Sequence, residues 1–202
     1  MRILLILLPA ELLVEINLQP RLQVQLWKRS ISTLVVDSPK YGFWAGSQYQ
    51  IVSGSVSGDY AAPAYTGGDQ DATHYVTVPD VLHSTGSVSV TNLGGNYNYL
   101  GLWWGSIDEL NKLELLNGST SVATIWGSGV STSPDGNWFS PSTNKYVNIQ
   151  LNGATFDNFI MSYNGIAFEA DNIAVGVVPE PGTMLLLGLG LIGVAGIRRF
   201  KK

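Results

Sequence analysis

Between positions 33 and 177 the chain consists of short apolar runs separated by turn-forming residues, and this pattern limits what it can fold into. The segment 86–92 alternates valine with small polar residues, as a strand with one buried face does. Two further runs, 113–116 and 122–126, flank the pair Asn117-Gly118, which is a favoured hairpin turn. Short alternating runs joined by such turns indicate β-structure throughout this region.

Roughly nine or ten such strands, spaced about 8–12 residues apart, predict an all-β domain over 33–177 with a β-sandwich or jelly-roll-like fold. No stretch of ten residues there has the period of a helix, and only 106–111 could form a single turn. The remaining expected strands are 49–55, 74–78, 97–104, 146–151, 156–163, 166–168 and 173–178.

The charge distribution of the chain restricts its partners. Of its 11 basic and 15 acidic residues, only three bases but twelve acids fall between 33 and 177. So acidic a domain argues against nucleic acid as a partner and is compatible with divalent cations or neutral glycans. The absence of cysteine excludes disulfides, thiolate metal sites and a cysteine nucleophile.

Residues 178–202, the sorting tail, have three parts in a fixed order. Two prolines around one residue force an extended, exposed backbone that a protease can enter, in the motif Val178, Pro179, Glu180, Pro181. An uncharged run comes next at 182–197; as a helix its sixteen residues would span about 24 Å. A basic cluster ends the chain at Arg198, Arg199, Lys201 and Lys202.

These parts predict a single C-terminal transmembrane helix over 182–197, with the basic cluster 198–202 on the cytoplasmic side of the inner membrane. The alternative is a buried core helix with a basic end. Glycine is frequent in this run, and it is poor in soluble helices but common in membrane ones, so the membrane interpretation is favoured.

The order of motif, apolar run and basic cluster resembles the PEP-CTERM sorting signal, with the signature on Pro179, Glu180 and Pro181. The resemblance implies recognition by exosortase, a membrane-embedded protease or transpeptidase of Gram-negative bacteria. Processing near the motif would remove the membrane anchor. The mature protein would then reach the cell surface or an extracellular polysaccharide matrix.

The middle domain resembles a family of exosortase-dependent surface proteins. One shared block runs from 100 to 108 and leads into 113–118, with the sequences LGLWWGSID and LELLNG. A second block is 167–174, AFEADNIA, which closes the domain shortly before the sorting tail. The resemblance supports the destination of the protein but implies no molecular activity.

Residues 1–32 are set apart from the fold as a signal region. Arg2 precedes a short apolar run, 3–8, which is at the lower limit for the core of a signal peptide, and Glu11 and Glu15 place charges soon after this run. Two interpretations stay open. The region is a weak signal peptide, or the chosen start is wrong and the true signal lies upstream.

Calcium is the one metal that the sequence suggests. Asp69 and Asp71 belong to a glycine-rich loop, and Ca²⁺ prefers carboxylate and carbonyl oxygens. The loop lacks the spacing of an EF-hand, so solvated turn acids are the alternative. Asp171 and Asn172 are expected to bond to backbone at the end of the sandwich instead.

Exposed tryptophans are the second kind of candidate site, because sugars stack on aromatic faces. Trp103 and Trp104 are neighbours in a strand and so face opposite sides. One is expected in the core and the other is a possible glycan contact, together with Trp44, Trp126 or Trp138. The alternative is that all these rings fill the core.

Catalysis has weak support in the sequence. His74 and His83 have no associated nucleophile pattern or metal-ligand spacing. A glycosidase would need two carboxyls roughly 5–10 Å apart in a cleft, with Glu114 or Glu169 as candidates.

The sequence therefore predicts a non-enzymatic, exosortase-processed surface or matrix protein with a structural role beside exopolysaccharide. A carbohydrate-binding adhesin that uses exposed aromatics, and calcium if Asp69 and Asp71 bind it, is the alternative. A secreted hydrolase is less favoured, and no other cofactor is expected.

Overall fold

The computed structural model describes residues 3–7, 13–19, 31–33, 43–45, 48–64, 69–80, 82–165 and 167–178. One group of strands comprises β1 Ile3–Leu7, β2 Leu13–Gln19, β3 Ile31–Thr33, β5 Gln50–Val52, β6 Tyr75–Val78, β8 Tyr99–Gly105, β11 Lys145–Asn152 and β13 Phe168–Gly176. A second group comprises β4 Phe43–Ala45, β7 Thr85–Thr91, β9 Lys112–Asn117, β10 Thr120–Trp126 and β12 Asn158–Asn164. One short helix, α1 Gly127–Val130, comes directly after β10.

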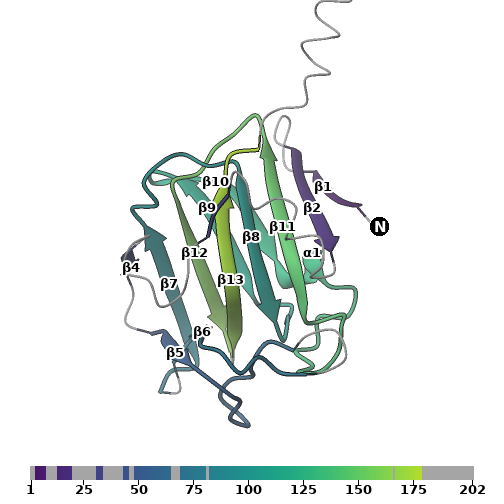
Figure 1. Ribbon diagram of the computed structural model, residues 1–202. Helices are drawn as coiled ribbons and strands as arrows, with labels where there is room; N and C mark the ends of the chain where they lie inside the picture. Colours follow the sequence, from purple (N-terminus) through teal and green to yellow (C-terminus); the bar gives the residue numbers. More distant parts are fainter. Residues whose placement is uncertain are drawn as a thin grey trace, which may run out of the picture.

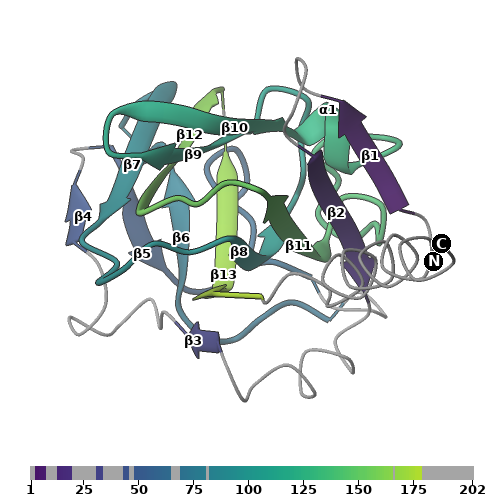
Figure 2. The ribbon, with the colours of Figure 1, turned by 90° about the horizontal axis from the view of Figure 1, so that it is seen from above.

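These strands form two antiparallel sheets that pack face to face (Figures 1 and 2). The larger sheet has the order β1-β2-β11-β8-β13-β6-β5, with β3 also paired to β13. The smaller sheet has the order β10-β9-β12-β7-β4. The all-β sandwich predicted from the alternating pattern is therefore confirmed.

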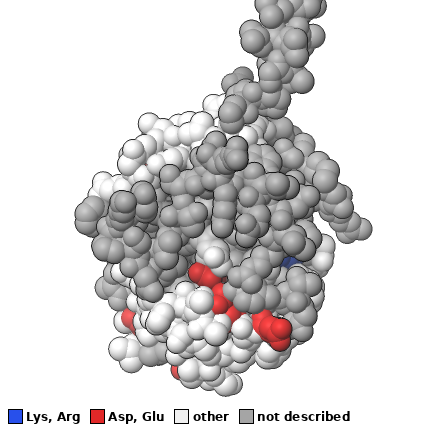
Figure 3. Space-filling view, viewed as in Figure 1, with Lys and Arg blue, Asp and Glu red and all other residues white. Residues whose placement is uncertain are grey.

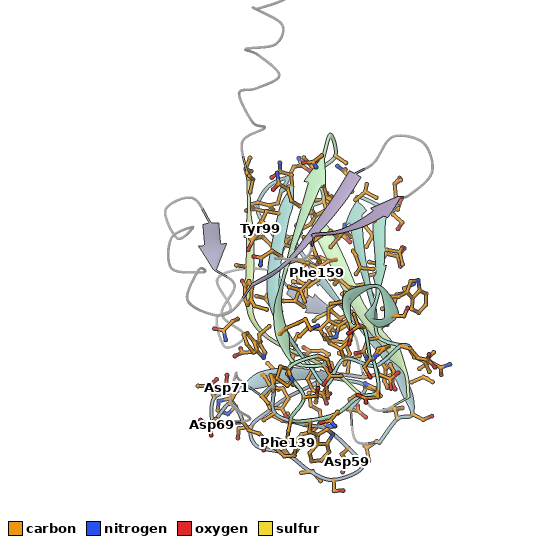
Figure 4. The ribbon with its side chains drawn as sticks, turned by 90° about the vertical axis from the view of Figure 1, so that its right-hand side faces the viewer. Asp59, Asp69, Asp71, Tyr99, Phe139 and Phe159 are labelled. Carbon is orange, nitrogen blue, oxygen red and sulfur yellow. The ribbon has the colours of Figure 1, made fainter. Side chains whose placement is uncertain are left out.

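The core lies between the two sheets because apolar side chains alternate along the strands. Strand β9 buries Leu113 and Leu115 and leaves the intervening polar residues on the outer face. From the larger sheet, the Trp104 indole stacks on the Phe168 ring, with 4.4 Å between the ring centroids. Phe159 of β12 completes the layer from the opposite side (Figure 4).

Strand β8 is buried on both of its faces. On the outer face the rings of Tyr99 and Tyr146 pass over Gly101, where an added Cβ would lie 2.5 Å from both hydroxyl oxygens. Glycine is therefore required at this position. The Tyr99 hydroxyl donates a hydrogen bond to Asn148 Oδ1 at 2.6 Å, and burial raises the pKa of the Tyr146 hydroxyl.

Several local predictions can be compared with the structure. The hairpin at Asn117-Gly118 is confirmed: β9 and β10 pair through Asn117 and Thr120, and Gly118 has φ of +58°. The segment 106–111 contains one turn, closed by a hydrogen bond from the Asn111 N–H to the Asp108 carbonyl at 3.2 Å. The short helix α1, at 127–130, was not predicted.

The predictions for the two ends of the chain can be compared with the structure in part. Strands β1 and β2 fall within 1–32, and the seven residues of β2 pair with Tyr146 to Asn152 of β11. No strands were predicted there, and the signal region stays a prediction, because pairing in the full chain does not test whether the region is removed. The predicted membrane helix at 182–197 lies outside the described residues. Within the described part, none of the helical segments has the length and apolar character needed to cross a membrane.

The replacement Trp104→Ala should lower the free energy of unfolding by about 3–5 kcal/mol, because it leaves a cavity against Phe168. It also removes the hydrogen bond from the indole N–H to Asn111 Oδ1. Urea unfolding of the full-length chain in detergent would measure this. The matched control is Trp126→Ala, since Trp126 is 46% exposed and its loss should change stability by about 0.5 kcal/mol or less. Equal losses in the two variants would contradict the packing described.

Candidate functional site

Strand β13 runs between the two ends of the sandwich, and each end carries a feature with functional meaning. Phe168 at its start pairs with Val78, whereas Gly176 at its end pairs with Tyr99. At about 3.3 Å per residue, the strand covers roughly 26 Å. Figure 4 shows Asp59 at the lower end of the sandwich and Tyr99 in the upper half. The chain therefore leaves the domain far from where β13 begins.

The exit of the chain is held by one amide side chain. The Val178 N–H donates to Asn98 Oδ1 at 2.7 Å, and Asn98 Nδ2 donates to the Val178 carbonyl at 2.8 Å. The Asn98 backbone N–H also donates to the Gly176 carbonyl at 3.1 Å. The folded domain is thus hydrogen-bonded up to the residue before Pro179, which has no N–H to continue the pairing.

A pocket opens at the opposite end of the sandwich, where β13 begins; we call it the β13 pocket. Its volume is about 230 Å³, and its wall comes from segments far apart in the sequence. The side chains that line it are those of Asp59, Tyr60, Ser106, Trp138, Ala167 and Glu169. Gly58 and Gly136 add backbone without side chains, at φ of +88° and +67°.

Asn144 ties three of the pocket's segments together. Its Oδ1 accepts hydrogen bonds from the backbone N–H groups of Ala64 and Ser106, both at 3.1 Å. Its Nδ2 donates to the Trp138 carbonyl at 3.1 Å and to the carbonyls of Asn137 and Ser140. Asn144 is 6% exposed, so these bonds replace the water that its amide loses on burial. The loop 137–140, which we call the Trp138 loop, is thereby fixed against the end of β8.

Glu169 forms a second buried connection at the base of the β13 pocket. Its Oε1 accepts a hydrogen bond from the Ala61 N–H at 2.9 Å, and its Oε2 shares a hydrogen bond with Ser106 Oγ. Burial raises the pKa of the carboxyl group to about 8, against the lowering effect of the two hydrogen bonds. Burial thus favours the neutral form of Glu169, and Asp59 is the other carboxyl group in the lining.

The surroundings of this pocket are acidic. Neither lysine nor arginine is among its described lining residues. Burial raises the pKa of the Tyr163 hydroxyl, and the nearby carboxylate of Asp108 raises it further. In Figure 3 the acidic side chains on this face gather in its lower part. Asp59 and Glu169 are the acidic residues of the lining itself.

The predicted tryptophan pair is buried in this structure. Trp104 is 0% exposed and Trp103 is 3% exposed, because β8 is buried on both faces of the larger sheet. The expectation that one of the two would be exposed is therefore wrong for the chain as described. Trp126, on β10, is exposed instead, and Trp138 is half-buried in the wall of the β13 pocket. The side chain of Trp44 lies outside the described residues.

The two predicted calcium ligands, Asp69 and Asp71, lie in different environments. Asp69 is exposed, whereas Asp71 is 5% exposed and its Oδ1 accepts hydrogen bonds from the N–H and the hydroxyl of Thr73. Among the residues that the structure describes, no group of three His, Asp or Glu side chains could hold a metal ion. Calcium binding by Asp69 and Asp71 stays a prediction with no assembled ligand set.

The candidate catalytic residues are separated from one another. Glu114 pairs with Lys112 at 2.9 Å on the outer face of the smaller sheet, whereas Glu169 lies on the outer side of the larger one. The core of the sandwich stands between them. His83 Nδ1 lies 2.6 Å from Asp80 Oδ1, and this hydrogen bond lowers the pKa of Asp80 in an exposed turn.

The structure and the comparisons together define a class of protein: an antiparallel β-sandwich followed by a sorting tail. The family model of the PEP-CTERM protein-sorting motif matches residues 177–199. The chain thus carries the PEP-CTERM sorting motif that its sequence predicted, and this motif supports an exported, membrane-anchored precursor. Of the predicted motif, Val178 is described; Pro179 to Pro181 and the basic cluster lie outside the described residues.

No curated protein matches the sequence significantly. Among solved structures, a mutant of a family 29 carbohydrate-binding module is similar at 18% identity and a TM-score of 0.31, covering 69% of this chain and 98% of that one. The K2 cleaved adhesin domain of Lys-gingipain is similar at 14% identity and a TM-score of 0.33, covering 73% and 98%. Neither likeness is close enough to carry an argument about function.

The replacement Glu169→Gln should flatten the pH dependence of stability. The folded chain keeps the Glu169 proton up to about pH 8, whereas the unfolded chain loses it near pH 4.5. The free energy of unfolding therefore falls as the pH rises through that window, by an amount on the order of a few kcal/mol. Glutamine fits the same hydrogen bonds and cannot ionise. Urea unfolding of both proteins at about pH 5 and about pH 8 checks this; parallel pH profiles would refute it.

The replacement Asn98→Ala should loosen the exit of the chain, because Val178 loses both of its hydrogen bonds to the side chain. We expect faster amide exchange at Val178 and a stability loss of about 1–3 kcal/mol. Hydrogen-exchange mass spectrometry of the full-length chain in detergent measures the first. Asn152→Ala, at the end of β11, is the matched control and should leave Val178 unchanged. Unaltered exchange at Val178 in Asn98→Ala would show that the side-chain hydrogen bonds of Asn98 do not hold the exit of the chain.

Proposed function

We propose that this chain is an exported protein of a Gram-negative bacterium that exosortase releases from the inner membrane, and that its sandwich has a non-enzymatic, structural role. Its destination is the cell surface or an extracellular matrix, in association with exopolysaccharide. The proposal rests on the sorting motif at 177–199 together with its position relative to the fold.

The carrying observation is that the domain ends where the motif begins. Strand β13 ends at Gly176, and the two side-chain hydrogen bonds of Asn98 hold Val178 just before Pro179. No described strand comes after β13, so one cleavage in the tail would free the whole described sandwich without removing any of its strands. A sorting signal needs such a junction, because cleavage inside a sheet would break the ladder of hydrogen bonds.

Carbohydrate binding by the sandwich is the second candidate, and the β13 pocket favours it. A half-buried tryptophan and a tyrosine line this pocket beside polar groups. The exposed tryptophan expected on β8 does not support this candidate, since both residues there are buried.

A hydrolase is less favoured, although Asp59 and Glu169 both line the pocket. A general acid must reach the glycosidic oxygen of the substrate. Both oxygens of Glu169 are already used in holding Ala61 and Ser106, and the side chain is 1% exposed. Its role is better explained as a structural one.

The replacement Glu180→Ala should leave the chain unprocessed and bound to the inner membrane, because it removes the charged residue of the Pro-Glu-Pro motif. Mass spectrometry of the protein from fractions of its native host measures both the C-terminus and the location. Glu109→Ala, a matched removal of an exposed acid from the sandwich, should be processed normally. Recovery of the wild-type chain with its tail intact through Lys202 in the inner membrane would overturn the sorting proposal.

A further inference from the structure

The β13 pocket is built before any ligand arrives. Asn144 fixes the Trp138 loop, the end of β8 and the segment at Ala64, while Glu169 fixes Ala61 and Ser106. Each of these bonds is internal to the protein and at least partly buried. A binding site with this support loses little conformational entropy when it is occupied. The pocket is therefore more than a gap between loops.

The lining suits a molecule with an apolar face and hydroxyl groups. Trp138 and Tyr60 supply aromatic surface, and Asp59 supplies carboxylate oxygens, while Ser106 and Glu169 are bonded to each other at the base. Ligand pockets are usually apolar with a small number of placed polar groups, and those for drug-sized molecules measure roughly 300–1,000 Å³. At about 230 Å³ this pocket is smaller, which suits one sugar ring.

The charge of the pocket limits the kind of sugar. Asp59 is among the lining residues, and no cationic side chain is among the described ones. A uronic or sulfated sugar would meet repulsion there. An amine would be attracted by Asp59 and by the aromatic rings, so a cationic probe belongs in the test as the competing ligand. Ser106 and Glu169 are bonded to each other at the base of the pocket, so Asp59 is the lining carboxylate left for the hydroxyl groups of a ligand.

The pocket also faces away from the tether. Glu169 is the second residue of β13 and the chain exits after its last residue, so the strand's length of roughly 26 Å separates the two. While the tail anchors the precursor, the pocket is held at the far end of the sandwich from the point of attachment. The point of attachment of the tail therefore does not cover the pocket.

We infer that the β13 pocket binds a neutral saccharide, with one sugar ring seated between Trp138 and Tyr60 and its hydroxyl groups bonded to Asp59. The biological setting of this inference rests on the proposed function, since a matrix protein is surrounded by glycans. The geometry of the site does not depend on processing. This is a binding site and not a catalytic one.

The test is an oligosaccharide-binding assay on the full-length chain, purified in a detergent without a sugar headgroup. The probes are neutral glucan, mannan and galactan oligosaccharides, with uronic-acid oligosaccharides and choline for comparison. We expect a neutral oligosaccharide to bind with a dissociation constant between about 1 μM and 1 mM. Binding of only the acidic oligosaccharides or choline, or of no probe, would overturn the inference.

Variants locate the binding. Trp138→Ala should weaken affinity at least tenfold, whereas Trp126→Ala, a matched change of an exposed tryptophan on β10, should leave it unchanged. Asp59→Asn preserves shape, so it separates loss of binding from loss of folding, and it should also weaken affinity. Equal affinity in wild type and Asp59→Asn, or equal losses in the two tryptophan variants, would place the ligand elsewhere and refute the site.

The outcome is independent of the sorting test. The assay uses the unprocessed chain, so absent binding would remove the saccharide site and leave the sorting proposal intact. If Glu180→Ala were processed normally, the binding measurement would still stand.

Discussion

The structure depends on the place of β13 inside the larger sheet, next to the middle strand β8. This strand pairs with β8 on one side and with β6 and β3 on the other, and its Phe168 stacks on Trp104 in the core. A strand held from both sides has little freedom to move along its axis. Its two ends are therefore fixed points: the base of the pocket at Glu169, and the exit of the chain after Gly176.

Buried polar side chains organise the pocket end of the molecule, although burying them costs free energy unless they are hydrogen-bonded. A buried amide or carboxyl group without partners is costly, but Asn144 and Glu169 both have theirs. These bonds fix loops that have few apolar contacts of their own. Loops pinned by buried hydrogen bonds can present side chains such as Trp138 in a defined position, as a binding site requires.

The sorting motif and the proposed binding site lie at opposite ends of the described sandwich. The PEP-CTERM motif directs the molecule and begins where the sheet stops, while the β13 pocket lies at the other end of the same strand. An address and a binding function placed apart do not interfere, because cleavage near the motif leaves every residue of the pocket untouched. The described sandwich thus fits delivery to the surface as an intact unit.

The sequence by itself determined the fold class and the presence of a sorting motif, because both depend on local patterns. Alternation and turn pairs such as Asn117-Gly118 predict strands, and a proline motif, an apolar run and a basic cluster in order define a sorting signal. The sequence could not predict which tryptophan is exposed, since that depends on which strand lies in the middle of the larger sheet. Tertiary structure alone brought Asp59, Ser106, Trp138 and Glu169 together, and it alone showed Asn144 at their centre. Contacts across 80 or more residues, such as Ala64 to Asn144, have no local signature, because they arise only when two sheets pack.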